Sequence, residues 1–260
     1  MKKTTYRIAF FNSFLLTKNY FFEIGGFALK TALSEIIGTF GFVFVGTGAI
    51  VFSAPFIGWL GIALAAGLSY AAMSFAFPDG HFNPMFSIAA FCAKRENWKT
   101  ALIRLFGQTA GAFAAAWVLS VVLNGKTGFV ADTALAGNYS DRYSVEALLT
   151  AETVLDALFV AVFLATRNTA KAPAALGVFL TGATFVGYPI AKGAMNPVKS
   201  TALAVFSTPE AVASLKYFWA CGITAAVVCG LVALLMAHQQ RNVCVQNQAL
   251  GETAQNPAAH

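Results

Sequence analysis

Two stretches of the chain each place an Asn-Pro pair directly before an apolar run that is too short to cross a membrane: Asn83-Pro84 and Asn196-Pro197. An Asn side chain can cap the free N–H groups at the start of a helix, and Pro suits the first helical position. The two runs extend over 84–93 and 197–206. The pattern predicts two matching half-helices, one in each half of the chain, and the rest of the chain must form a scaffold that holds them.

The composition places that scaffold in a membrane. Of the 260 residues, 58% are hydrophobic and only 11% are charged, whereas a soluble domain has about 25% charged residues. A bilayer-spanning helix needs about 20 apolar residues. Six such segments are predicted, at about 31–53, 57–77, 99–123, 146–166, 173–190 and 214–237. The expected fold is therefore an all-α membrane protein with six transmembrane helices and two half-helices, which follow the second and the fifth span.

The order of these elements is that of an internal repeat. Glu35, early in the first span, precedes Asn83 by 48 positions (83 − 35), and Glu152, early in the fourth span, precedes Asn196 by 44 positions (196 − 152). Each repeat holds three spans, which is an odd number, so the second repeat must be inverted relative to the first. Inverted repeats with broken helices place a permeation site near the middle of the bilayer.

We expect a channel domain over 31–237, with its repeats at about 31–125 and 140–237. Residues 1–30 are expected to form a cytoplasmic arm that lies along the membrane surface or is poorly ordered, and the polar residues 238–260 a disordered tail. Positive charge favours the cytoplasmic side, and with both termini inside, the inner side holds eleven basic residues against five outside. The inner ones are Lys2, Lys3, Arg7, Lys18, Lys30, Lys94, Arg95, Lys99, Arg167, Lys171 and Arg241, and the outer ones Lys126, Arg142, Lys192, Lys199 and Lys216. The sequence thus predicts a multi-pass protein of a bacterial inner membrane, in contact with the lipid bilayer, with both termini in the cytoplasm.

Other classes of function find little support in the sequence. The net charge of +6 comes from short loops and the N-terminus, not from a basic stripe, so nucleic-acid binding is not expected. The four cysteines have no C-x-x-C spacing and are expected to act as small hydrophobic residues. We predict no metal, no cofactor and no catalytic residues, and hence no enzyme.

Two half-helices that enter from opposite faces would meet with their N-termini at the centre. Each N-terminus presents free N–H groups and about half a positive charge, so the pair repels cations. The amides of Asn83 and Asn196 are left to donate hydrogen bonds to a passing oxygen. A water molecule held by two donors cannot also accept from its neighbours, so a proton wire would be broken there. This arrangement is suited to a channel for neutral molecules.

The motifs His81-Phe82-Asn83-Pro84 and Gly193-Ala194-Met195-Asn196-Pro197 resemble those of the aquaporin (major intrinsic protein) family. The resemblance also includes Glu35 with the Gly38-Thr39 that follows it, and Gln108 in the third span, and it runs from about Thr31 to Ala237. It implies a right-handed bundle, an hourglass-shaped pore in each subunit of a homotetramer, and passive flow of water or small neutral solutes. Asn83 and Asn196 would lie at the pore centre. Glu35 and Glu152 would accept hydrogen bonds from the irregular backbone, supported by His81 and Gln108.

The chain departs from the family pattern at several positions. Met85 and Val198 replace the Ala of both Asn-Pro-Ala motifs and are expected to pack behind the Asn, and Gly222 stands where the last span often has Pro. Lys199 stands where the family usually has an Arg in the outer constriction, and Lys lacks the planar fork of Arg. The other filter positions are small: Ala66, Thr184 and Gly193. This wide filter resembles that of nodulin-like channels and their bacterial relatives, which pass metalloid hydroxides such as boric or arsenious acid, and it leaves glycerol and urea as candidate solutes.

Alternatives remain open at this stage. Glu35 and Glu152 could instead lie at the headgroup level, and Arg104 could pair with a carboxylate or reach the interface; Asp156, one turn after Glu152, has no assigned role. Gly107 and Gly111 have a spacing that suits close helix packing. The chain could also be a closed-pore or structural member of the family, or a secondary active transporter, because broken helices occur there too.

Overall fold

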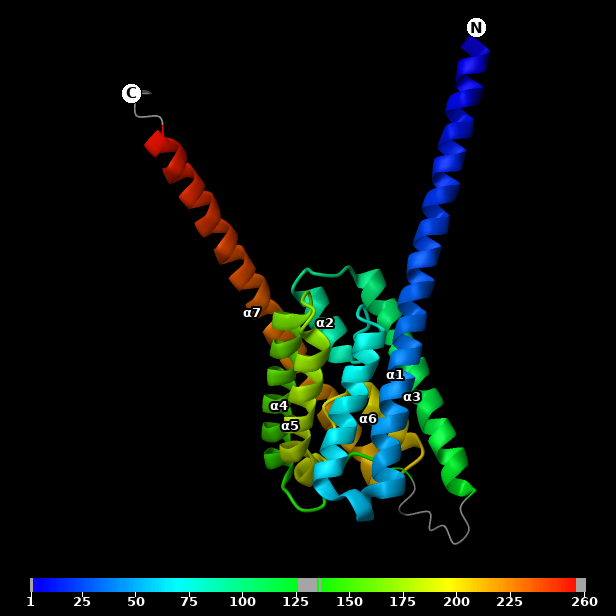
Figure 1. Cartoon of the computed structure of the whole chain (residues 1–260), viewed down its shortest axis with the longest axis vertical. Helices are drawn as coiled ribbons and strands as arrows, with labels where there is room; N and C mark the ends of the chain where they lie inside the picture. The colour runs from blue at the N-terminus through cyan, green and yellow to red at the C-terminus, as the bar shows by residue number, and fades with distance from the viewer. Residues whose placement is uncertain (1, 126–134, 136, 256–260) are drawn as a thin grey trace.

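The computed structural model describes residues 2–125, 135 and 137–255, and every regular element in these residues is a helix. Figure 1 shows them as a bundle from which both ends of the chain project. The helices are α1 (Lys2–Ala76), α2 (Pro84–Cys92), α3 (Trp98–Asn124), α4 (Val145–Thr166), α5 (Ala172–Ala191), α6 (Pro197–Val205) and α7 (Pro209–Gln255).

Helix α1 contains two spans joined at a sharp break. Gly58 has φ 55° and ψ −168°, a conformation that essentially only glycine adopts, and Pro55 lies one turn before it. The chain folds back on itself there, because Gly41 lies against Met73 and Gly46 against Ser69. The two arms of α1 therefore run antiparallel (Figure 1).

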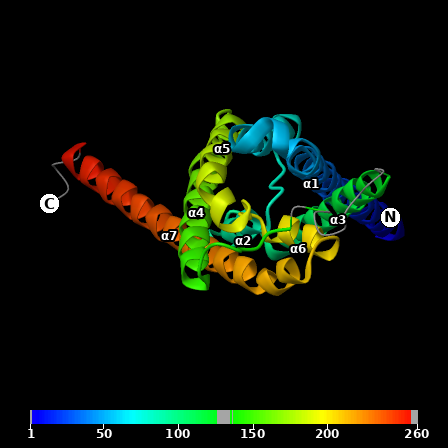
Figure 2. The ribbon, with the colours of Figure 1, turned by 90° about the horizontal axis from the view of Figure 1, so that it is seen from below.

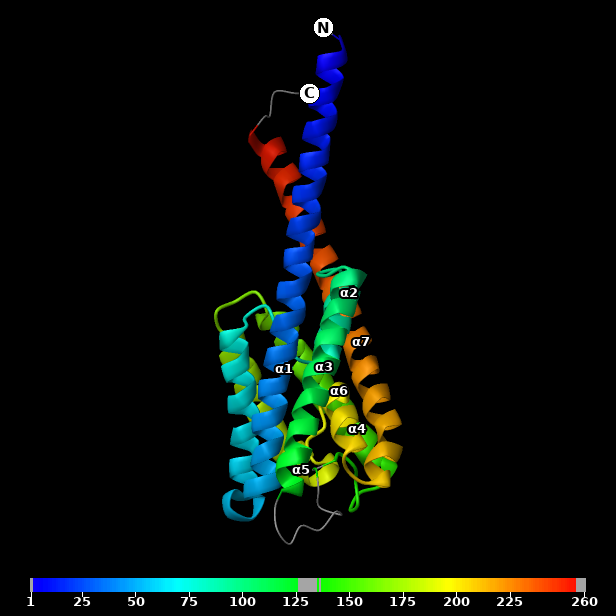
Figure 3. The ribbon, with the colours of Figure 1, turned by 90° about the vertical axis from the view of Figure 1, so that its right-hand side faces the viewer.

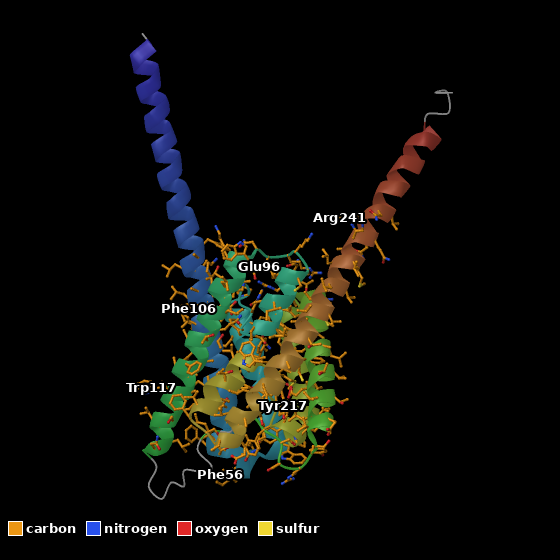
Figure 4. All side chains as sticks on the ribbon, turned by 180° about the vertical axis from the view of Figure 1, so that it is seen from behind. Phe56, Glu96, Phe106, Trp117, Tyr217 and Arg241 are labelled. Carbon is orange, nitrogen blue, oxygen red and sulfur yellow. The ribbon has the colours of Figure 1, made fainter. Side chains whose placement is uncertain are left out.

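The predicted number of spans is confirmed. Among the described residues, five helices are long and apolar enough to cross a membrane, and α1 counts twice because it is broken at Gly58. The apolar part of α1, Gly26–Ala76, has 51 residues; as one straight helix it would be roughly 76 Å long, more than twice the bilayer core of about 30 Å. The side chains on the outside of the bundle are largely apolar, such as Phe106 and Trp117 on α3 (Figure 4).

Both ends of the chain extend beyond the same end of the bundle (Figures 1 and 3). The sequence predicts an arm on the membrane surface or a poorly ordered one for 1–30, and a disordered tail for 238–260. The structure differs: α1 is helical from Lys2 and continues the first span in line, and α7 is helical through Gln255. Residues 238–250 contain no Gly or Pro that would stop a helix and include good helix formers such as Ala, Gln and Leu. Residues 256–260 lie outside the described part of the chain.

Close packing between spans depends on small residues. A Cβ added at Gly111 would lie 2.3 Å from the carbonyl oxygen of Ile36, and one at Gly107 would lie 2.7 Å from Cβ of Glu35. The packing role expected for these two glycines is confirmed. Gly67 and Gly177 likewise let α1 and α5 approach, since each added Cβ would meet the other residue's carbonyl oxygen.

The half-helices α2 and α6 lie inside the ring formed by the spanning helices (Figure 2). They begin at the predicted Pro84 and Pro197 and each ends one residue before the predicted end. They contribute Met85, Phe86 and Val198 to the buried core. The inverted pair of half-helices is thus held at the centre of the bundle.

Candidate functional site

Each half-helix is capped by the Asn that precedes it. Asn83 and Asn196 have extended backbones, with φ −150° and −158°. The side-chain oxygen of Asn83 accepts a hydrogen bond from the backbone N–H of Met85 at 3.1 Å. The side-chain oxygen of Asn196 accepts one from the backbone N–H of Lys199, also at 3.1 Å. The caps fix where both amide nitrogens point.

The two Asn side chains also bind each other's loops. The amide nitrogen of Asn83 donates to the carbonyl oxygen of Met195 at 2.9 Å, and that of Asn196 donates to the carbonyl oxygen of Phe82 at 2.8 Å. Phe82 and Met195 both have left-handed backbones, with φ 53° and 42°, an uncommon conformation for residues other than glycine. An Asn amide nitrogen carries two hydrogens, so each of these bonds uses one and leaves one.

A buried network supports the first loop. The Glu35 carboxylate accepts from the backbone N–H groups of His81 and Phe82, each at 2.7 Å. Gln108 donates to the same carboxylate at 3.1 Å and to the Ser87 hydroxyl at 3.0 Å. His81, through Nδ1, is within hydrogen-bond distance of that hydroxyl, at 3.0 Å. The structure therefore places Glu35, Gln108 and His81 together behind the start of α2.

Arg104 pairs with Glu35. Its Nη1 lies 2.7 Å from Glu35 and also donates to the carbonyl oxygen of Asp79 at 2.6 Å, while its Nε lies 2.6 Å from Glu96. Removing one partner of a buried ion pair is strongly destabilising. Of the two expected possibilities for Arg104, the pairing with a carboxylate is the one observed.

In the second repeat, Glu152 forms no direct ion pair with a basic side chain among the described residues. Glu152 accepts from the backbone N–H of Met195 at 3.3 Å, but its second oxygen has no hydrogen-bond partner among the described residues. Asp156, one turn further along α4, is buried and also has one oxygen without such a partner. The residue of the first repeat that corresponds to Asp156 is Thr39, since Thr39 follows Glu35 by four residues and Asp156 follows Glu152 by four residues. The two repeats thus share their backbone geometry but not their charges.

All four predicted filter residues and both Asn residues line one cavity of about 30 Å³, here called the central cavity. A water molecule needs roughly 10–15 Å³ of such space, so the cavity holds about two. Thr184 donates its hydroxyl hydrogen to the carbonyl oxygen of Leu180 at 2.7 Å, and Lys199 donates from Nζ to the carbonyl oxygen of Gly193 at 2.5 Å. The Lys199 ammonium is therefore held against the loop that carries Gly193.

The variant motif residues have structural partners. A Cβ added at Gly222 would lie 3.0 Å from Sδ of Met85 and 2.8 Å from Cγ of Pro197. The missing side chain on α7 leaves room for the large Met85 in place of the usual Ala. Two departures noted in the sequence, Met85 and Gly222, thus fit one another.

Sequence reasoning missed two groups of residues. Asn138 donates to the carbonyl oxygens of Ala191 and Lys192 at 3.1 and 2.8 Å and accepts from Ser200 at 2.9 Å. It lies in a long connection, and no local pattern identified it. The other group, Phe42, Tyr70, Phe159 and Leu180, lines the central cavity. Phe42 and Phe159 each follow the repeat glutamate by seven residues, two helical turns, and this spacing was a usable signal.

A family model described as Major intrinsic protein matches residues 26–249. Aquaporin Z of Photorhabdus laumondii subsp. laumondii is 34% identical over 230 residues, covering 82% of this chain and 100% of that protein. Aquaporin Z of Brucella melitensis biotype 1 is 34% identical over 219 residues, covering 78% and 96%. The solved aquaglyceroporin of Plasmodium falciparum has a similar fold, with a TM-score of 0.66 at 18% identity over 80% of this chain and 94% of that one. The chain belongs to the major intrinsic protein family.

The arrangement can bind a small polar molecule through hydrogen bonds. In the part of the chain that the structure describes, no group of three or more His, Cys, Asp or Glu side chains is placed to hold a metal ion. What the site offers is a narrow cavity, two capped helix N-termini and two amide nitrogens with a hydrogen to spare.

Proposed function

We propose that the protein is a passive transmembrane channel for water and small uncharged solutes. One observation carries this proposal: Asn83 and Asn196, at the N-termini of two half-helices, line the same narrow cavity. Each amide retains one hydrogen with which it can bind a solute oxygen. The names of the relatives, aquaporin Z and aquaglyceroporin, support the same class of function, and we propose no enzymatic activity.

Exclusion of protons and cations follows from the two helix N-termini. Each carries a partial positive charge, and in a narrow passage the two repel a cation. Lys199 adds a full positive charge to the cavity wall. A water molecule that accepts from both Asn amides has no lone pair free for its neighbours, so protons cannot be relayed through it.

The outer filter is proposed to be Ala66, Thr184, Gly193 and Lys199. Three of these side chains are small, and the ammonium of Lys199 is held on the Gly193 carbonyl. A filter of this width suits solutes larger than water, and we propose glycerol, urea and metalloid hydroxides such as boric or arsenious acid as the candidate class.

We further propose a homotetramer in a bacterial inner membrane with both termini in the cytoplasm, and a channel domain over residues 31–237. Exposed apolar side chains on α1 and α5, such as Leu68 and Val178, leave wide faces for lipid or for neighbouring subunits. Crosslinking in mild detergent should give tetramers; monomers alone would contradict this assembly.

Swelling of proteoliposomes tests the function. A channel conducts water, glycerol, urea or boric acid down an osmotic gradient with no ion gradient present. A secondary transporter would need an ion gradient, and a closed-pore or structural family member would give the swelling rate of empty liposomes. Either of those results would overturn the proposal.

A further inference from the structure

Three aromatic side chains line the central cavity one helical turn deeper than the outer filter. Tyr70 follows Ala66 by four residues on α1, and Phe42 and Phe159 occupy equivalent positions in the two repeats. They are 5%, 1% and 1% exposed for Phe42, Tyr70 and Phe159. We call these three residues the aromatic constriction.

The ring of Tyr70 contacts each of the other two rings. The centroids of Phe42 and Tyr70 are 5.1 Å apart at 77°, and those of Tyr70 and Phe159 are 5.7 Å apart at 62°. Edge-to-face pairs at this spacing are close-packed. The Tyr70 hydroxyl donates to the carbonyl oxygen of His81 at 2.6 Å, which fixes the middle ring on the loop that leads to Asn83.

The ring of Phe159 packs against two further aromatic rings. It lies 4.7 Å from that of Phe86 and stacks on Phe179 at 5.4 Å. Phe163, one turn further along α4, stacks on Phe86 at 4.2 Å and also borders a second cavity of about 330 Å³. Four residues of helix span roughly 6 Å, so the aromatic layer between the two cavities is about one turn thick.

Arg167 closes the far side of this layer. It donates to the carbonyl oxygens of Pro78 and Asp79 at 2.7 and 2.9 Å and to Nε2 of His81 at 3.2 Å. It lines the second cavity together with Phe163. The loop before Asn83 is therefore fixed on both sides of the aromatic layer, by Tyr70 on one and Arg167 on the other.

We propose that the aromatic constriction, and not the outer filter, sets the size limit of the channel. This inference rests on the proposed function. Three of the four outer-filter residues are small, whereas one turn deeper the passage runs between the Asn amides and three packed rings. A solute crosses only when a ring swings aside, and a larger solute requires a larger displacement.

Phe159→Ala tests this most directly, with Phe159→Leu as a milder variant. Phe179→Ala is the matched control, because Phe179 stacks on the same ring but does not line the central cavity. We expect Phe159→Ala to raise the ratio of glycerol to water flux in proteoliposomes by tenfold or more, and Phe159→Leu to raise it less. Phe179→Ala should leave the ratio within twofold of the wild type.

The possible outcomes separate the two proposals. Wild-type flux with an unchanged ratio in both Phe159 variants would overturn the aromatic constriction and leave the channel intact. An equal rise in Phe179→Ala would also overturn it, because the effect would then be general loosening of the core. If the wild type and the three variants all eluted as a single species from a sizing column and none of them conducted water or glycerol, the channel function itself would be overturned. If the wild type did not conduct while Phe159→Ala did, the proposed function of the wild-type protein would be overturned, and the aromatic constriction would be shown to block the passage.

Discussion

At the scale of single residues, Asn83 and Asn196 each form hydrogen bonds with both the oxygen and the nitrogen of the side-chain amide. The oxygen caps a half-helix and the nitrogen holds the opposite loop, which leaves one hydrogen directed to the cavity. A carboxylate at either position would keep the cap, because it also accepts. It would lose the hydrogen bond donated to the opposite loop and the remaining amide hydrogen, and it would add a negative charge where two positive helix ends meet.

We therefore expect Asn83→Asp and Asn196→Asp to lower neutral-solute flux and to admit cations. Swelling rates report the first effect and a sodium- or proton-sensitive dye inside the liposomes reports the second. Unchanged swelling together with an unchanged cation leak would show that neither residue faces the permeation path.

Met85 and Gly222 should be energetically coupled. Gly222→Ala places a methyl group 3.0 Å from the Met85 sulfur, and overpacking of this kind costs about 1–3 kcal/mol. In a Met85→Ala background the contact with the sulfur is gone, whereas the contact with Cγ of Pro197 at 2.8 Å remains, so we expect the Gly222→Ala penalty to fall but not to vanish. Thermal unfolding of the four proteins in detergent measures the cycle, and additive penalties would contradict the coupling.

At the scale of elements, a glycine is required at the break in α1 but not in the interior of α5. Neither Gly58 nor Gly182 would place a Cβ within 4 Å of another residue. Gly58 has a positive φ that side chains rarely adopt, whereas Gly182 lies inside a regular helix. Space is therefore equal at the two sites, and only backbone conformation differs.

We expect Gly58→Ala to destabilise the protein by about 1–3 kcal/mol through backbone strain, and Gly182→Ala to stabilise it by about 0.5–1 kcal/mol through helix propensity. The midpoint of thermal unfolding should move in opposite directions for the two variants. A shift of the same sign in both would contradict the assigned break at Gly58.

The sequence predicted the starts of the half-helices well and the contacts between distant elements poorly. The starts of α2 and α6 were predictable because Asn-Pro acts locally. The pairing of Arg104 with Glu35, 69 positions apart, and the bonds of Asn138 to a loop more than 50 positions away were not, because no local pattern encodes such contacts. The helical C-terminal end was missed because a polar composition was taken as disorder, although residues 238–250 contain no Gly or Pro.

At the scale of the whole molecule, the outer filter and the aromatic constriction lie in series along one path. Resistances in series add, so narrowing either one limits flux. Ala66→Phe with Thr184→His fills the outer filter with rings and leaves Lys199 in place, so that only size changes.

For this double variant we expect glycerol or boric acid flux to fall by tenfold or more, since about 1.4 kcal/mol of added barrier is enough, and water flux to fall less. Combined with Phe159→Ala, it should cancel the gain in glycerol flux. The same swelling assay measures both, and if glycerol flux in the combined variant stayed as high as in Phe159→Ala alone, the two narrow points would not share one path.

The crossed bonds from Asn83 to Met195 and from Asn196 to Phe82 also bear on how the chain is made. Each of these bonds joins an atom of the first repeat to an atom of the second, 112 and 114 positions apart. While the ribosome has synthesised only the first repeat, the Asn83 amide and the Phe82 carbonyl have no such partner. The first loop is completed only when the loop of the second repeat is in place, so final assembly must await the synthesis and insertion of the second half-helix. A half-chain would be an inserted intermediate and not a half-channel.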